Sequence, residues 1–202
     1  MIRRDFFNTG TLAVLGTSLF STLDPIIKVL SPTDEKAIGT AKNIIFLVSD
    51  GMSNGTLNMA NLLSERMYGR ESKWITLYRE NKVKRAYMDT ASANAMVTDS
   101  AASSSAWGGG VRVNNGKINT NADGTFNTPI LQKFKKAGKK VGCVTTVPIT
   151  HATPAGFCIA NNSRGNQSEI ALQYLPLKFD VMMGGGDKYF NSTKRKDKID
   201  VY

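Results

Sequence analysis

The sequence predicts an α/β fold in which helices flank a mainly parallel β-sheet. One observation is that short apolar runs alternate along the chain with segments typical of helices, as in proteins built from β-α-β units. A second is the run Asn43–Val48, whose apolar residues follow one another without interruption, as in a strand buried on both faces. The 202 residues are 41% hydrophobic and 21% charged, which is typical of a globular domain with a core.

The expected elements follow one another in a regular order. Helices are expected near Thr56–Arg66, around Trp74–Glu80, over Ser100–Trp107 and over Thr128–Ala137, the last with Pro129 in its first turn and Gly138 just past its end. Strands are expected at Asn43–Val48, Lys84–Asp89, Lys140–Val147 and Phe179–Met183, the last ending in Gly184-Gly185-Gly186. Residues 114–127 are rich in Asn and Gly and predict a loop or hairpin.

The amino-terminal residues are typical of an export signal rather than of part of the folded domain. Arg3 and Arg4 precede a mildly apolar run over Thr11–Phe20, which is too short to span a membrane and resembles a twin-arginine export signal. An uncleaved amphipathic arm is the alternative. We therefore expect residues 1–35 to be an export signal and linker, residues 36–202 to form the folded part, and the protein to be exported, to the periplasm.

The net charge of +10 would suit an anionic partner, but the basic residues form no single stripe. They lie mostly in polar stretches that we expect to be solvent-exposed, such as 82–85, 133–140 and 194–198, and no RNA-binding motif or zinc finger accompanies them. The sequence therefore predicts no nucleic-acid partner. Cys143 and Cys158 are too few for a disulfide framework, and either a single bridge or two buried thiols fits the sequence.

Residues that can carry chemistry follow the expected strands, where sites of open α/β sheets lie. Asp50 comes after the first strand and could bind a metal ion or cap the next helix. Ser100 lies in VTDSAAS (97–103), where a helix start could hold an anion, although a serine nucleophile also needs a base or a metal for activation. No GxSxG motif surrounds it, which argues against an α/β-hydrolase.

Two further candidates lie in the second half of the chain. His151, the only histidine, and Thr153 lie in HATPAG (151–156), where they could help to line a metal site. Arg164 offers a planar guanidinium suited to two phosphate oxygens. Taken singly, a lone histidine is more often structural, and a loop arginine is more often simply exposed.

Taken together, these motifs resemble the alkaline phosphatases. The likeness runs from about Asn43 to about Phe190, in the order apolar strand, Asp-Gly-Met, Val-Thr-Asp-Ser-Ala-Ala-Ser, His-Ala-Thr-Pro-Ala, arginine and Gly-Gly-Gly. The sulfatases and phosphodiesterases of the same broad superfamily use a different nucleophile context, so they are weaker alternatives.

The resemblance implies a phosphate monoester hydrolase that acts through a phosphoserine at a zinc and magnesium centre. In that family Ser100 would be the nucleophile and a zinc ligand, Arg164 would clamp phosphate, and Asp99 would hold Arg164. Asp50 would bridge zinc and magnesium, Thr153 would bind magnesium, and His151 would lie at the magnesium site, where relatives differ. Phosphate monoesters would be the substrates, and a homodimer is an expectation for the full-length protein.

The chain departs from the family in length and in histidine content. Members are roughly twice as long, and their later half supplies three zinc-binding histidines and further acidic ligands. We therefore expect an incomplete carboxyl-terminal half, an amino-terminal part of an alkaline phosphatase-like domain, and little activity in this chain alone. The alternative in another class is a non-catalytic fragment that binds phosphate or a protein partner.

Overall fold

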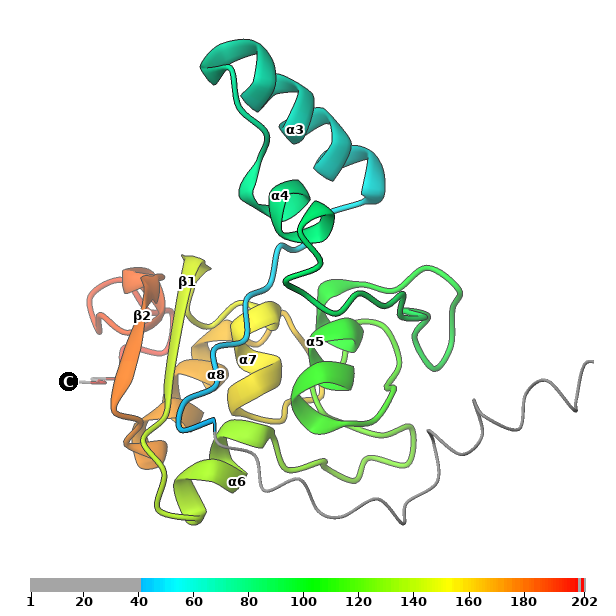
Figure 1. Cartoon of the computed structure of the whole chain (residues 1–202). Helices are drawn as coiled ribbons and strands as arrows, with labels where there is room; N and C mark the ends of the chain where they lie inside the picture. The colour runs from blue at the N-terminus through cyan, green and yellow to red at the C-terminus, as the bar shows by residue number, and fades with distance from the viewer. Residues whose placement is uncertain (1–40, 200, 202) are drawn as a thin grey trace, which may run out of the picture. The chain divides into compact units, whose positions relative to one another are not determined.

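The computed structural model describes residues 41–199 and 201, and one compact unit begins at Val48 (Figure 1). The export signal and linker predicted for residues 1–35 lie outside the described residues. The longer elements in chain order are α3 (Asn54–Tyr68), α4 (Lys73–Arg79), α5 (Ser100–Gly109), α6 (Ile130–Lys136), β1 (Gly142–Pro148), α7 (Ala152–Cys158), α8 (Gln167–Tyr174) and β2 (Val181–Gly185). Two short 3₁₀ helices, Leu175–Leu177 and Asp187–Tyr189, flank β2.

The strands β1 and β2 form a parallel sheet, as the alternation of strands and helices predicted. Gly142 pairs with Val181 and Val144 pairs with Met183. Helix α6 comes before β1 along the chain, and α7 and α8 lie between β1 and β2. Gly184 lets the strands approach, because a Cβ there would lie 2.8 Å from Cγ2 of Thr145 and 3.0 Å from the carbonyl oxygen of Val147.

All four predicted helices are present. α3 begins at the cap Ser53, whose hydroxyl accepts from the amide of Thr56, and it ends at Gly69 in the left-handed region. The expected turn at Gly138 also has positive φ (+75°), just beyond α6. Residues 114–127 form the predicted loop, with an isolated antiparallel bridge between Thr120 and Phe126.

Two predicted strands are wrong. Residues 43–48 are extended but form no strand, and the side chains of Ile44, Ile45 and Leu47 are exposed by 78%, 82% and 82%. Residues 84–89 also form no strand, and Tyr87 is exposed. A strand needs a neighbour for its backbone hydrogen bonds, and among the described residues the sheet consists of β1 and β2 only. The apolar residues of these two segments predicted burial in a sheet. Neither segment pairs with a strand among the described residues.

One basic residue also departs from expectation. Arg195 was expected in a solvent-exposed stretch, but only 1% of its surface is accessible. It forms an ion pair with Asp197, and its guanidinium donates to the carbonyl oxygen of Ser168 at 3.0 Å. A guanidinium can be buried in this way because each of its donors can find an acceptor, and here it holds the carboxyl-terminal loop against α8.

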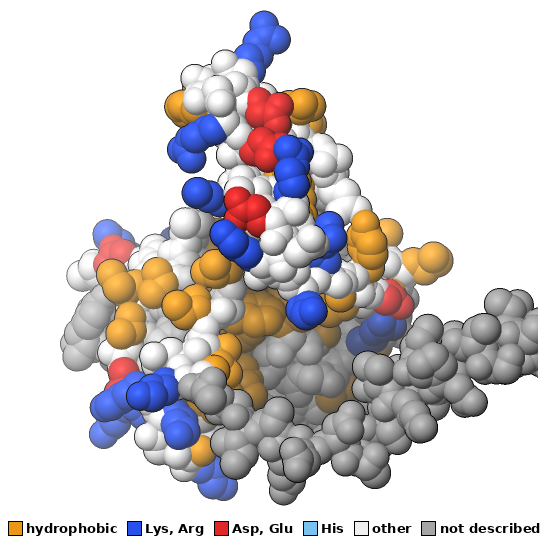
Figure 2. All heavy atoms as spheres, viewed as in Figure 1, with side chains coloured by type: hydrophobic (Ala, Val, Ile, Leu, Met, Phe, Trp, Pro, Cys, Tyr) orange, Lys and Arg blue, Asp and Glu red, His pale blue; other side chains and the backbone are white. Residues whose placement is uncertain are grey.

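The core lies between α5, α7, α8 and β1. Its buried members are Ala101, Ile118, Ile149, Ala152, Ala155, Cys158, Ile159, Ile170 and Tyr174. In contrast, α3 has no buried residue, and Met59, Leu62 and Leu63 are more than half exposed. Figure 2 shows apolar side chains interspersed with charged ones on the surface that it presents.

Helices α5 and α7 lie side by side (Figure 1), and their backbones meet at Gly108 and Gly156. A Cβ added to Gly108 would lie 2.1 Å from the carbonyl oxygen of Gly156, and one added to Gly156 would lie 2.2 Å from Oγ of Ser104. Asn119 crosses the same contact, since its side-chain amide donates to the carbonyl oxygens of Gly156 and Ile159, both at 2.7 Å.

We expect Gly156→Ala to destabilise the protein by about 1–3 kcal/mol, because the added methyl group would force α5 and α7 apart. Gly55→Ala is the matched control: it lies in exposed α3, where an added Cβ would lie 3.5 Å from its nearest atom, Oγ of Ser53. That change should be neutral or stabilising, because Ala is the better helix former. Urea unfolding followed by circular dichroism measures both, and equal effects would contradict this account of the helix contact.

Candidate active site

The candidate residues meet where two helices begin. Ser100 is the first residue of α5, and Thr153 is the second residue of α7, which follows the carboxyl end of β1. This is where sites of parallel sheets are expected to lie. The helix starts because Asp99 caps it: its Oδ1 accepts from the amide of Ala102 at 2.9 Å.

Asp50 joins the two helix starts through its carboxylate. Ser100 Oγ donates to Asp50 Oδ1 at 3.2 Å, and Thr153 Oγ1 donates to Asp50 Oδ2 at 2.7 Å. Asp50 therefore does not cap the next helix, which is the role of Ser53. Three oxygen-bearing side chains from distant parts of the sequence thus converge on one point.

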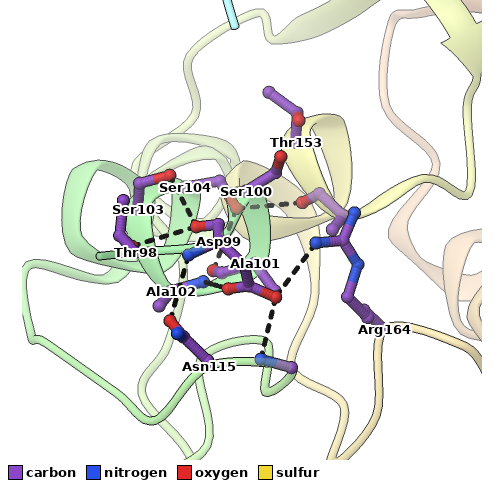
Figure 3. A network of polar contacts seen from close by, with 12 residues as sticks. Thr98, Asp99, Ser100, Ala101, Ala102, Ser103, Ser104, Asn115, Thr153 and Arg164 are labelled. Atoms are coloured by element: carbon purple, nitrogen blue, oxygen red, sulfur yellow. Dashed lines mark hydrogen bonds and ion pairs between the residues drawn. The ribbon is translucent and has the colours of Figure 1, made fainter. Parts of the chain in front are cut away.

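Asp99 and Arg164 form the second part of the site (Figure 3). Nη1 of Arg164 donates to Oδ2 of Asp99 at 2.9 Å, and about a third or less of either side chain is exposed. The same Oδ2 accepts from the backbone amide of Gly116 at 2.9 Å. One carboxylate therefore caps α5 and orients the guanidinium.

These contacts change the pKa of Asp99. Burial alone would raise the pKa, but hydrogen bonds from the amide of Ala102, from the side chain of Arg164 and from the amide of Gly116 outweigh it and lower the pKa below its usual value. The carboxylate is consequently ionised at neutral pH.

His151 precedes α7 beside this cluster. Burial lowers its pKa, the charge of Arg164 lowers it further, and Asp50 acts in the opposite direction. The imidazole is therefore neutral near pH 7. Its Nδ1 atom is buried and has no hydrogen-bond partner among the described residues. One ring nitrogen of His151 is therefore not used in a hydrogen bond within this part of the protein.

The donor set fits a metal ion only in part. The oxygens of Asp50, Ser100 and Thr153 suit a hard cation such as magnesium, which commonly keeps several waters and takes few protein ligands. Zinc sites use three or four protein ligands, and among residues 41–199 and 201 no three His, Cys, Asp or Glu side chains gather in a group that could hold a metal.

The fold brings Asp50, Ser100 and Thr153 together beside the Asp99–Arg164 pair, all of which the sequence named as candidates. Nothing in the sequence indicated that the turn at Asn115 and Gly116 belongs beside them. Oδ1 of Asn115 accepts from the amide of Asp99 at 3.0 Å (Figure 3), and the carbonyl oxygen of Gly116 accepts from the amide of Arg164 at 2.8 Å. Gly116 has positive φ (+82°), which favours glycine. The Asn-Asn-Gly signal predicted a turn, but only the fold brings that turn to Asp99.

A match to the family model described as alkaline phosphatase covers residues 41–201. The chain belongs to the alkaline phosphatase family. Alkaline phosphatase 3 of Bacillus subtilis (strain 168) is 33% identical over 200 residues, an alignment that covers 93% of this chain and 42% of the relative. The tissue-nonspecific isozyme of Rattus norvegicus is 32% identical, with 78% of this chain and 35% of the relative covered.

Solved structures of the family share the fold. The alkaline phosphatase of Thermus thermophilus superposes with a TM-score of 0.67 at 39% identity, over 72% of this chain and 30% of that one. A variant of the alkaline phosphatase from the Antarctic bacterium TAB5, described with magnesium bound in its M3 site, gives 0.60 at 31% identity, over 71% of this chain and 40% of that one. The chain thus spans less than half the length of these relatives.

We predict that Asp99 makes stability depend on pH in acid. A pKa lowered by folding contributes stability that is present above the unfolded value of about 3.9 and is lost as the pH falls through the folded value. The free energy of unfolding of Asp99→Asn should therefore fall less steeply below about pH 4 than that of the unmodified protein. Urea titrations at a series of pH values measure the slopes.

Arg164→Ala is the companion variant, because it removes the charged partner and leaves the two backbone amides that bind Asp99. Its slope should lie between the other two. If Asp99→Asn and the unmodified protein had the same slope, Asp99 would not carry this pH dependence.

Proposed function

We propose that this chain supplies the nucleophile and phosphate-binding part of an alkaline phosphatase that hydrolyses phosphate monoesters. Ser100 attacks phosphorus, the alcohol departs, and water then hydrolyses the phosphoserine. The observation that carries the proposal is the convergence of Ser100 and Thr153 on Asp50 beside the Asp99–Arg164 pair. A serine at a helix start, beside an arginine oriented for an anion, suits attack on a phosphate group.

Arg164 is proposed to clamp the phosphate. Asp99 accepts from one terminal nitrogen of the guanidinium, and a guanidinium has five N–H donors in a planar fork. Donors remain for two phosphate oxygens, which is the bidentate geometry that arginine favours. Asp99 and Gly116 fix the direction of the fork before substrate arrives.

Asp50, Ser100 and Thr153 are proposed ligands of the zinc and magnesium ions, with His151 beside the magnesium site. When bound, such ions activate a hydroxyl nucleophile and stabilise the charge of the attacking and leaving oxygens. The residues of this chain hold one corner of that centre. Asp50 orients the hydroxyls of Ser100 and Thr153, and neutral His151 offers an uncharged ring nitrogen.

These 202 residues are proposed to have little phosphatase activity by themselves. Catalysis of phosphoryl transfer depends on charge placed around the phosphoryl group, and the described residues contain no three-ligand cluster for zinc. The same observation favours, as a second candidate, a non-catalytic fragment that binds phosphate through Arg164. Equilibrium dialysis against zinc separates the two, since an enzyme must retain the metal and a simple phosphate binder need not.

The site of action is also a proposal. The signal-like Arg3–Arg4 and the apolar run after it suit export to the periplasm. Among the described residues, no helix has the length and apolar character needed to cross a membrane. For the full-length protein we propose phosphate monoesters as substrates, no nucleic-acid partner, and a homodimer.

The first test assays the chain itself. Residues 36–202, with excess zinc and magnesium, should hydrolyse p-nitrophenyl phosphate at alkaline pH far more slowly than an intact relative such as alkaline phosphatase 3 of Bacillus subtilis. A rate within about tenfold of that relative, a barrier difference of roughly 1.4 kcal/mol, would contradict the proposed inactivity if chelator and Ser100→Ala both abolished it.

The second test examines the nucleophile in a complete fold. Residues 41–201 replace the matching segment of the Bacillus subtilis relative, and the chimera is quenched in acid during turnover of ³²P-labelled substrate. Label should appear on Ser100 and disappear in Ser100→Ala. Ser103→Ala is the matched control, because Ser103 lies one turn further along α5 and its hydroxyl donates to the carbonyl oxygen of Asp99. Full labelling of Ser100→Ala would exclude Ser100 as the nucleophile.

A further inference from the structure

The only two cysteines of the sequence lie side by side in the fold. Cys143 belongs to β1 and Cys158 is the last residue of α7. Both are free thiols, Cys143 packs against the buried cluster that contains Cys158, and each thiol shifts the pKa of the other. Residues 149–151 are the whole connection between β1 and α7, so the two thiols come from neighbouring elements of one supersecondary unit.

The surroundings hold both thiols in place and expose them unequally. Cys143 is half-buried in β1, where it pairs with Met182 of β2. Cys158 is fully buried in the core, and its carbonyl oxygen accepts from Nε2 of Gln132 at 2.7 Å. A reagent from solvent can therefore reach Cys143 first, whereas Cys158 is reached most directly through Cys143.

We propose that Cys143 and Cys158 are a redox-active pair that forms an intrachain disulfide with small disulfides such as oxidised glutathione, and that Cys143 is the thiol that reacts first. Neither the phosphatase activity nor the metal centre is needed for this assignment. It concerns a site on the opposite end of α7 from Thr153.

The reaction balances as two thiol–disulfide exchanges. The Cys143 thiolate attacks one sulfur of the oxidant, forms a mixed disulfide and releases one glutathione thiolate. Cys158 then attacks the Cys143 sulfur, its proton passes to the departing second glutathione, and the intrachain bond forms. The two cysteines lose two electrons and two protons in total, and one oxidised glutathione becomes two reduced ones.

The ionisation of the thiols supports this order. The hydrogen bond from Cys158 lowers the pKa of Cys143, although burial opposes the change. The same hydrogen bond raises the pKa of Cys158, and burial raises it further. Because the thiolate is the attacking species, Cys143 is the better first nucleophile.

The disulfide would act on the helix that carries a site residue. α7 begins beside His151, carries Thr153 in its first turn and ends at Cys158. A covalent bond from its last residue to β1 would fix this helix relative to the sheet. Closing a loop of about fifteen residues also restricts the unfolded chain, so the oxidised protein should unfold at a higher temperature.

The test uses the full chain, purified in reductant on a cleavable solubilising fusion and then exposed to oxidised glutathione without denaturant. Intact mass after alkylation and peptide mapping should show loss of both free thiols and a Cys143–Cys158 cross-link within one chain. The melting temperature should rise by several degrees, and dithiothreitol should reverse both changes. Native protein that keeps both thiols alkylatable, or that forms only bonds between chains, would overturn the proposal.

Single variants test which thiol reacts first. Cys158→Ala should trap one glutathione on Cys143, and Cys143→Ala should react at least about tenfold more slowly, because its remaining thiol is buried and less ionised. Circular dichroism checks that both variants are folded, and Cys158→Ser replaces Cys158→Ala if the latter is not. Equal rates in the two folded variants would refute Cys143 as the first nucleophile.

Discussion

The contact between α5 and α7 is the constraint on which the rest of the site depends. Gly108 and Gly156 let the two helices approach until backbone meets backbone. Each helix begins with a residue of the site, Ser100 in α5 and Thr153 one residue into α7. A side chain at the glycine contact would spread the helices, and the carboxylate of Asp50 could then no longer accept from both hydroxyls.

Asp99 links local structure to chemistry because it performs three tasks with one carboxylate. It caps α5, accepts from Gly116 and binds Arg164. The cap places Ser100 at the helix start, where amides favour an anion, and the ion pair orients a cation toward the same region. Asn115 and Gly116 support both functions from a loop, so the site depends on a turn that carries no reactive group.

The described residues form a site that is rich in oxygen donors and poor in the nitrogen and sulfur donors that zinc prefers. The chain spans less than half of the relatives that it matches, and its described residues supply oxygen donors and one buried histidine nitrogen rather than complete zinc ligation. Apolar side chains of α3 and of residues 44–47 are exposed in this structure.

The sequence by itself predicted four of the helices, the parallel pairing of the two later strands and the family, and it named the candidate site residues that the fold brings together, whereas α7 and α8 were not expected. Capping residues, glycines and the TDSAAS motif are local signals, which can be recognised within one short segment of the sequence. Tertiary structure alone decided that 43–48 and 84–89 form no strand, that Arg195 is buried, that Asn115 supports Asp99 and that Cys143 meets Cys158. The physical reason is that strand pairing, burial and thiol contact each need a partner distant in the chain, and periodicity in one segment carries no information about whether that partner is present.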